Sequence, residues 1–261
     1  MDYYDLISGM YTGIKKMKLD DISLEEFDKR FDSFKGFNYK SLDDDEIFWE
    51  ITYIMFFNIG RKASMIEAKL PILKKYLYGY NKLAISSESD ISLIVNNTGF
   101  RPQVERVVAN ARTFQQIINK YGSFDNYLSV RFGIEDIHTS PDNLDRLSSE
   151  LSRIFKGYGV TAPLHLITEL GFDSIKPDSV VCRILYRLGL IDDIADIGGA
   201  IEIGRAISKD LNLPIRYVDV VIVKFGQVGP SATLGTKDGI CTENSPKCSI
   251  CTIKHLCRHH D

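Results

Sequence analysis

The sequence has no apolar run of about 18 residues, the length that a membrane-spanning helix requires. Its first residues, MDYYDLISGMYTG, lack the basic stretch and apolar core of a secretory signal. Internal repeats and low-complexity tracts are also lacking. We therefore expect a globular protein that resides in the cytoplasm, without a membrane partner.

An excess of basic charge is missing as well. The net charge is −3, from 32 Lys and Arg against 35 Asp and Glu. The imbalance lies in residues 1–50, which hold 13 acidic and 7 basic side chains. The remainder is mildly basic, so the net charge does not exclude nucleic acid as a partner, but binding would require a local basic patch.

Alternating β-branched runs are scarce, which predicts a mostly α-helical protein. Helical spacing is found over residues 44–60, 62–80, 102–121 and 143–155, with a short helix after Gly122. The run VDVVIVKF at 218–225 is the one good candidate for a strand, and a buried helix explains it equally well.

Cysteine is rare except at the end of the chain. Four of the five cysteines lie in the last 21 residues, with six, two and five residues between them: Cys241, Cys248, Cys251 and Cys257. A Cys-x-x-Cys pair places two thiolates on one turn, so four clustered thiols in a cytosolic protein predict a metal site. The spacing alone leaves zinc and an iron–sulfur cluster open. The fifth, Cys182, is expected to be a buried structural thiol.

Two further motifs lie upstream of the cysteines. Gly157-Tyr158-Gly159 separates two helical stretches, the second of which begins near Thr161. The glycines permit positive φ and let backbone N–H groups approach a phosphate, although a plain turn between helices has the same pattern. Asp178 follows a proline and precedes Arg183 by five residues. An N-cap with Arg183 as a surface charge is the alternative interpretation of this segment.

The three motifs, in this order, resemble the helix-hairpin-helix DNA glycosylase superfamily, and the cysteine spacing resembles the [4Fe–4S] loop of endonuclease III and the adenine DNA glycosylases. The resemblance covers about residues 44–261. It implies an all-α, two-lobed fold with a C-terminal iron–sulfur loop and a [4Fe–4S] cluster on the four cysteines. A helical barrel with the hairpin would span 45–172. Residues 173–261 would form the second lobe, against which 1–44 would pack, with Asp178 and the hairpin at the cleft between the lobes.

The resemblance also implies a chemistry. Cleavage of an N-glycosidic bond develops oxocarbenium character on the sugar, which the Asp178 carboxylate would stabilise while it helps to position water. Bifunctional members carry a lysine two residues after the second hairpin glycine, where this chain has Thr161. Lys156 and Lys176 are expected to contact phosphate or solvent. We therefore expect a monofunctional glycosylase without strand-cleaving (AP lyase) activity.

The same resemblance assigns DNA-binding and base-pocket residues. Beyond the hairpin residues Gly157, Tyr158, Gly159 and Thr161, Asn58 occupies the position of the family's DNA-plugging glutamine, and a helix C-cap is the alternative for it. Arg101 is expected to contact phosphate or wedge the duplex, unless it lies on a solvated helix face. Trp49 and Tyr53 would line the pocket for the extruded base, with a core position as the alternative.

The substrate is less well defined. The stretches 110–114 and 121–128 resemble bacterial 3-methyladenine DNA glycosylase I, which implies alkylated purines. A glycosylase that removes adenine or another base from a mismatch is one alternative, and a non-catalytic module that binds damaged DNA is another. In each case the partner would be double-stranded DNA with a damaged or mispaired base. The protein would act as a monomer on the cell's DNA.

Overall fold

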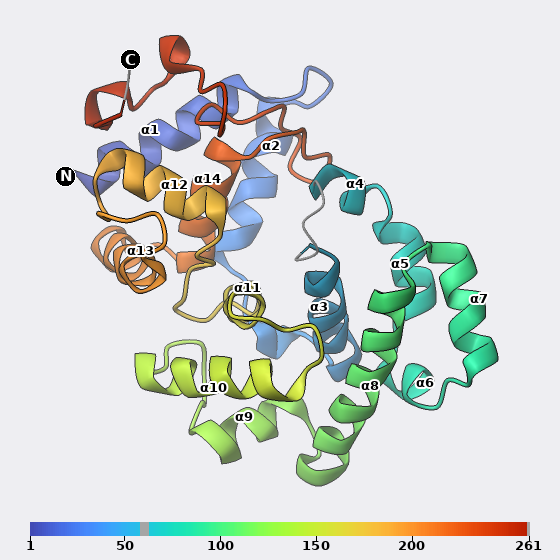
Figure 1. Cartoon of the computed structure of the whole chain (residues 1–261). Helices are drawn as coiled ribbons and strands as arrows, with labels where there is room; N and C mark the ends of the chain where they lie inside the picture. Colours follow the sequence, from blue (N-terminus) through green and yellow to red (C-terminus); the bar gives the residue numbers. More distant parts are fainter. Residues whose placement is uncertain (58–62, 260–261) are drawn as a thin grey trace. The chain divides into compact units, whose positions relative to one another are not determined.

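The computed structural model describes residues 1–57 and 63–259, and within these ranges every regular element is a helix (Figure 1). The prediction of an all-α protein is therefore confirmed. Extended pairing in the described ranges is limited to two isolated bridges, Lys18 with Thr236 and Ser231 with Thr236. None of the described helices combines the length and the apolarity that crossing a membrane would take.

The described chain divides into two compact units, each with its own core. The first unit combines residues 1–37, 63–64 and 173–259, and the second combines 38–57 and 65–172. Residues 38–44, which the sequence analysis placed with the N-terminal segment, belong to the second unit. There Tyr39 stacks on Phe172 with ring centroids 5.0 Å apart.

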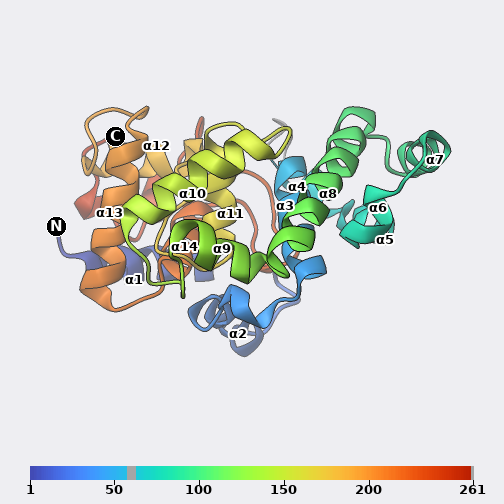
Figure 2. The same ribbon diagram turned by 90° about the horizontal axis from the view of Figure 1, so that it is seen from below.

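The second unit is built around a buried helix, α3 (Asp44–Phe57). Ile51, Ile54 and Phe56 on α3 are fully buried, which explains why its sequence is apolar nearly all round. The long helix α8 (Arg101–Tyr121) packs against α3, and Figure 2 shows it beside the shorter helices of this unit. The others are α5 (Leu70–Leu77), α6 (Tyr80–Ala84), α7 (Glu88–Thr98), α9 (Phe124–Phe132), α10 (Pro141–Ile154) and α11 (Thr161–Glu169). The short α4 (Ala63–Glu67) connects to α5.

The first unit packs its helices around α14 (Ile215–Gly226). This helix contacts α1 (Tyr3–Lys16), α12 (Ser179–Leu188) and α13 (Ile197–Leu211), and α2 (Leu24–Asp32) completes the unit (Figure 1). The run 218–225 lies in α14, so the strand alternative for it was wrong. The buried residues of this run have the i, i+3, i+4, i+7 spacing of a helix face rather than the alternation of a strand. They are Val218, Val221, Ile222 and Phe225.

Helix α1 packs against the C-terminal cysteine segment. The Thr252 hydroxyl donates to the Gly9 carbonyl at 2.6 Å, and His255 Nε2 lies 2.7 Å from Asp5 Oδ2. A Cβ at Gly9 would come within 2.5 Å of the Ile253 side chain. The acidic N-terminal segment therefore has a structural role, because it supports the loop that carries the four thiols.

Candidate functional site

Asp178 is the N-cap of α12. Its Oδ1 accepts hydrogen bonds from the backbone N–H groups of Val180 and Val181 at 2.9 and 3.0 Å. Its Oδ2 lies 3.3 Å from Nζ of Lys176, and the two side chains are 23% and 18% exposed. The N-cap interpretation is thus correct, but it accounts for only one carboxylate oxygen. The second oxygen forms an ion pair with Lys176, which the sequence analysis had assigned to phosphate or solvent.

The segment that leads into Asp178 is fixed by two other helices. The backbone N–H of Lys176 donates to Oδ1 of Asp219, a 7% exposed residue of α14, at 3.0 Å. Arg205 of α13 donates to the Asp173 carbonyl at 3.0 Å. Pro177 restricts the backbone between the two paired side chains. Asp178 therefore sits on a rigid support, as a group that must meet a substrate in a defined geometry requires.

Two arginines of α12 connect the Asp178 helix to the cysteine segment. Arg183 is only 8% exposed and donates to the Gly226 and Cys241 carbonyls at 2.8 and 3.4 Å, so the alternative of a surface charge was wrong. Burial lowers the pKa of its guanidinium. Arg187 donates to Sγ of Cys241 at 3.2 Å and to the carbonyls of Thr242 and Glu243 at 2.8 and 2.9 Å.

The four clustered cysteines line one cavity of about 280 Å³. Arg187, Lys247 and Lys254 also line it, so the thiols face cationic side chains, and His259 lies at the same cavity. Burial raises the pKa of the Cys251 and Cys257 thiols. Within the described ranges, no three His, Cys, Asp or Glu side chains converge as ligands of a single ion. Cys182 is 2% exposed and lies in the core of the first unit, as expected for a structural thiol.

The hairpin between α10 and α11 is held by a buried amide. The Lys156 N–H donates to Oδ1 of Asn110 at 2.7 Å, and Nδ2 of Asn110 donates back to the Lys156 carbonyl at 3.0 Å. Asn110 is 1% exposed. Gly157 has a φ of 85°, whereas Gly159 is outside the positive-φ region. Only the first hairpin glycine therefore has the left-handed backbone that the sequence analysis allowed for both.

Tyr158 does not face solvent, contrary to its assignment as a DNA contact. It is 5% exposed, and its hydroxyl donates to the Ile51 carbonyl of α3 at 2.8 Å. The Tyr158 ring is buried because it packs the hairpin turn against the core of the second unit. Val160, by contrast, is 70% exposed at the start of α11, and the sequence analysis did not single it out.

Two arginines of α8 differ in their surroundings. Arg101 lies 3.3 Å from Glu105 and 3.6 Å from Glu88, so its guanidinium is paired on an exposed helix face. Arg106 is exposed and lies beside the hairpin, since a Cβ at Gly157 would be 3.1 Å from its Cδ. Of these two arginines, Arg106 rather than Arg101 therefore lies at the hairpin. Asn58 lies outside the described residues.

The two aromatic residues assigned to the base pocket differ in their surroundings. Trp49 is 9% exposed and belongs to the core of the second unit, with Nζ of Lys74 5.7 Å from its ring. Tyr53 is half-buried and contacts the rings of Phe57 and His165, at centroid distances of 4.9 and 6.2 Å. Trp49 is thus a core residue, and of the two only Tyr53 retains appreciable exposure.

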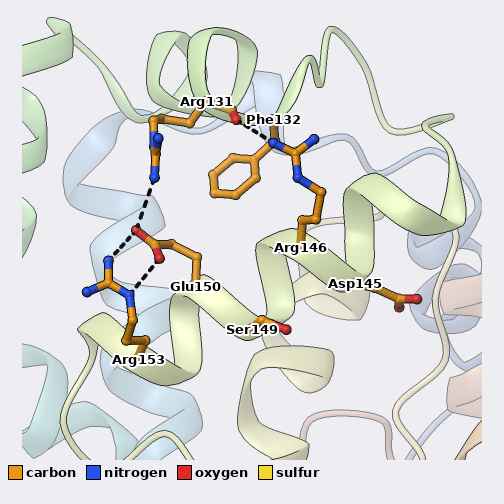
Figure 3. Close-up of a pocket in the computed structure, with 7 residues that line it drawn as sticks. All are labelled: Arg131, Phe132, Asp145, Arg146, Ser149, Glu150 and Arg153. Atoms are coloured by element: carbon orange, nitrogen blue, oxygen red, sulfur yellow. Dashed lines mark hydrogen bonds and ion pairs between the residues drawn. The ribbon is translucent and has the colours of Figure 1, made fainter.

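A separate hollow of about 440 Å³ lies between α9 and α10 (Figure 3). Glu150 accepts from Arg153 at 2.7 and 2.8 Å and lies 3.8 Å from Arg131. The Arg153 hydrogen bonds hold the pKa of Glu150 below its usual range. Arg146 covers the Phe132 ring at 5.8 Å. Three arginines and two carboxylates line the hollow, and its ion pairs join Arg131 and Arg153 to Glu150.

Comparison with solved structures identifies the fold. The structure is similar to the 8-oxoguanine DNA glycosylase of Methanocaldococcus jannaschii, with a TM-score of 0.54 and 19% identity over 85% of this chain and 95% of that one. A second structure from that organism, described as an 8-oxoguanine glycosylase/lyase in complex with DNA containing 8-oxoguanine, gives 0.54 and 21% over 83% and 94%. The 8-oxoguanine DNA glycosylase of Thermotoga maritima gives 0.53 and 16% over 85% and 95%. No protein-family model and no curated protein matches the sequence. The chain therefore has the helical fold of these glycosylases.

Proposed function

We propose that the protein is a DNA glycosylase of base excision repair, with Asp178 as its catalytic carboxylate. The observation that carries the proposal is the rigid placement of Asp178 at the start of α12, in a chain with the glycosylase fold. Because Oδ1 is occupied by two backbone N–H groups, Oδ2 is the oxygen that would act on the substrate.

The chemistry follows from that oxygen. Extrusion of the damaged nucleotide from the duplex would bring its sugar to Oδ2 of Asp178. The carboxylate would stabilise the positive charge that develops on the sugar as the glycosidic bond breaks, and it would orient the attacking water. The products are the free base and an abasic site in an intact strand.

The hairpin is proposed to hold the DNA backbone. Its exposed residues Lys156, Gly157, Gly159 and Val160 precede α11. The first backbone N–H groups of a helix have no partner within the helix, so this end of α11 favours a phosphate. Arg106 adds a positive charge beside this turn. The proposed partner is double-stranded DNA with a damaged base, bound by a monomer.

An alkylated purine is the proposed substrate, supported by the likeness of residues 110–114 and 121–128 to 3-methyladenine DNA glycosylase I. The three similar structures favour a second candidate, 8-oxoguanine, which is the base in their names. The two differ in charge, since common alkylated purines are cationic and 8-oxoguanine is neutral. A half-buried aromatic ring such as Tyr53 suits the cationic base.

We propose hydrolysis without AP lyase activity. In the second M. jannaschii structure the protein is called a glycosylase/lyase. In this chain Thr161 occupies the hairpin position where bifunctional relatives of endonuclease III carry their lysine. Without an amine at that position, water is the nucleophile.

The four cysteines are proposed to bind a [4Fe–4S] cluster. The donor set is the one that such a cluster takes, because four thiols line one cavity. Arg187, Lys247 and Lys254 line the same cavity and would offset the negative charge of a thiolate-ligated cluster. When bound, the cluster would order the C-terminal loop rather than take part in bond cleavage. Purified protein should contain about four iron and four sulfide per chain, whereas one zinc and no iron would refute the assignment.

The proposed activity is tested with a panel of duplexes that each contain one defined lesion or mismatch. Single-turnover release of the base is measured for 3-methyladenine, other alkylpurines, hypoxanthine, 8-oxoguanine and mispaired adenine. Release from the alkylated duplexes is the expected result. Tight binding to damaged duplex with no release from any of them would support the non-catalytic module instead.

A further inference from the structure

Lys176 forms an ion pair with the one oxygen of Asp178 that remains for chemistry. Oδ1 of Asp178 is occupied by the N–H groups of Val180 and Val181, and Oδ2 lies 3.3 Å from the Lys176 ammonium. The backbone of Lys176 is held by Asp219. The Lys176–Asp178 ion pair is therefore held by a fixed backbone. What it means for catalysis by Asp178 rests on the proposed glycosylase function.

This pairing conflicts with the charge that the reaction develops. As the glycosidic bond breaks, positive charge appears on the sugar beside Oδ2, and an ammonium group at the same oxygen repels that charge. The carboxylate stabilises the transition state best when the ammonium is elsewhere. In the free protein the ion pair neutralises both charges. The same pair would oppose the reaction, because it leaves the carboxylate less able to stabilise the sugar.

DNA supplies an alternative partner for the ammonium. The nucleotide that reaches Asp178 has a phosphodiester on each side of its sugar, so an anion arrives together with the substrate. The Lys176 stem is flexible and its side chain is 18% exposed, while its backbone is fixed by Asp219. The ammonium can exchange partners without any movement of α12.

We propose that Lys176 is a phosphate ligand for the target nucleotide, which leaves Asp178 for a phosphodiester oxygen when DNA binds. The amine keeps its proton throughout, and no covalent bond forms or breaks in this step. Oδ2 of Asp178 is then free to face the sugar. The binding of DNA and the exposure of Oδ2 are therefore coupled, because the Lys176 ammonium pairs with Asp178 in the free protein and with the phosphodiester in the complex.

The test compares Lys176→Met, Lys176→Arg and the control Lys209→Met, which removes an exposed lysine in the last turn of α13. Affinity for a duplex with a non-cleavable abasic analogue is measured as a function of salt concentration. Lys176→Met should weaken binding and reduce the slope of log Kd against log salt by about 0.9, the value for one phosphate contact. Lys176→Arg should restore most of the slope, and Lys209→Met should leave it unchanged.

Single-turnover base release measured as a function of DNA concentration completes the test. For Lys176→Met the DNA concentration that gives half-maximal release should rise in step with Kd, and Lys176→Arg should bring it back towards the wild-type value. An unchanged salt slope overturns the proposal, and an unchanged slope with a large fall in rate would assign Lys176 to positioning Asp178 instead. Failure of the proposed function itself is recognised separately, because wild-type protein would then release no base while the salt slope on the abasic analogue is still measurable.

Discussion

The guanidinium of Arg187 donates a hydrogen bond to Sγ of Cys241 at 3.2 Å, and the carbonyl of the same residue accepts one from the Arg258 N–H at 2.9 Å. Arg187 lies on α12, the helix that begins after Asp178. One residue of α12 therefore contacts both ends of the cysteine segment. Through this contact, order in the loop and order in α12 support each other.

Arg187→Gln should weaken the binding of the proposed [4Fe–4S] cluster. A hydrogen bond from a charged group contributes about 1.5–3 kcal/mol, and Arg187 also holds the Thr242 and Glu243 carbonyls. We expect less iron per chain and faster bleaching of the visible absorbance under a chelator. Arg153→Gln, a change on the surface of the second unit, is the matched control. Equal iron content and equal bleaching rates in the two variants would contradict the role of Arg187.

Asn110→Leu should loosen the hairpin without touching the chemistry. The substitution leaves the N–H and the carbonyl of Lys156 without their buried partner, at a cost of about 1–3 kcal/mol in the free energy of unfolding. We expect weaker binding of abasic-analogue DNA and a nearly normal single-turnover rate at saturation. Asn97→Leu on α7, where the amide bonds only within its own helix, serves as the control. A large loss of rate with unchanged affinity would be inconsistent with this account.

The two hairpin glycines should respond differently to alanine. Gly157 has a φ of 85°, and a Cβ there would be 3.1 Å from Cδ of Arg106, so Gly157→Ala should destabilise the fold by about 1–2 kcal/mol. Gly159 lies outside the positive-φ region, and a Cβ added to it would meet no atom within 4 Å. Gly159→Ala should leave thermal stability unchanged and weaken DNA binding, because a methyl group would stand where the phosphate approaches. Equal destabilisation by both changes would contradict the assigned turn geometry.

Borohydride should trap no covalent complex between the wild-type protein and DNA. Thr161 offers no amine at the position where bifunctional relatives of endonuclease III carry their lysine, and the Lys176 amine is in an ion pair with Asp178. Trapping is measured as a shifted band on a denaturing gel, with an established glycosylase/lyase as the positive control. Efficient trapping would overturn the monofunctional proposal, and its loss in Lys176→Met would identify that amine as the nucleophile.

Sequence patterns predicted the helices well where apolar spacing and caps coincide. The helix expected over 102–121 is α8, with Pro102 in its first turn and Gly122 at its C-cap. The helix expected over 143–155 is α10, whose N-cap is Ser140. The run 218–225 could not be decided from the sequence, because Val220 and Val223 are apolar as well and hide the helical spacing of the buried positions.

The surroundings of the site residues were harder to predict. The sequence places an aspartate before α12, but the pairing of Lys176 with its Oδ2 depends on where Asp219 of α14 fixes the backbone. The burial of Tyr158 depends on a carbonyl of α3, more than one hundred residues away in the chain. The role of Asn110 could not be predicted, because the spacing of an amphipathic helix does not show which backbone groups a buried amide will contact.

The central claim is that Asp178 performs the chemistry, and single-turnover base release by Asp178→Asn tests it most directly. The amide oxygen of asparagine retains an acceptor for the Val180 and Val181 N–H groups, so α12 should keep its cap. We predict that release from alkylated duplex falls by at least about 100-fold, roughly 2.7 kcal/mol of transition-state stabilisation, while affinity for the abasic analogue is retained. Release at the wild-type rate by a correctly folded Asp178→Asn protein would contradict the account.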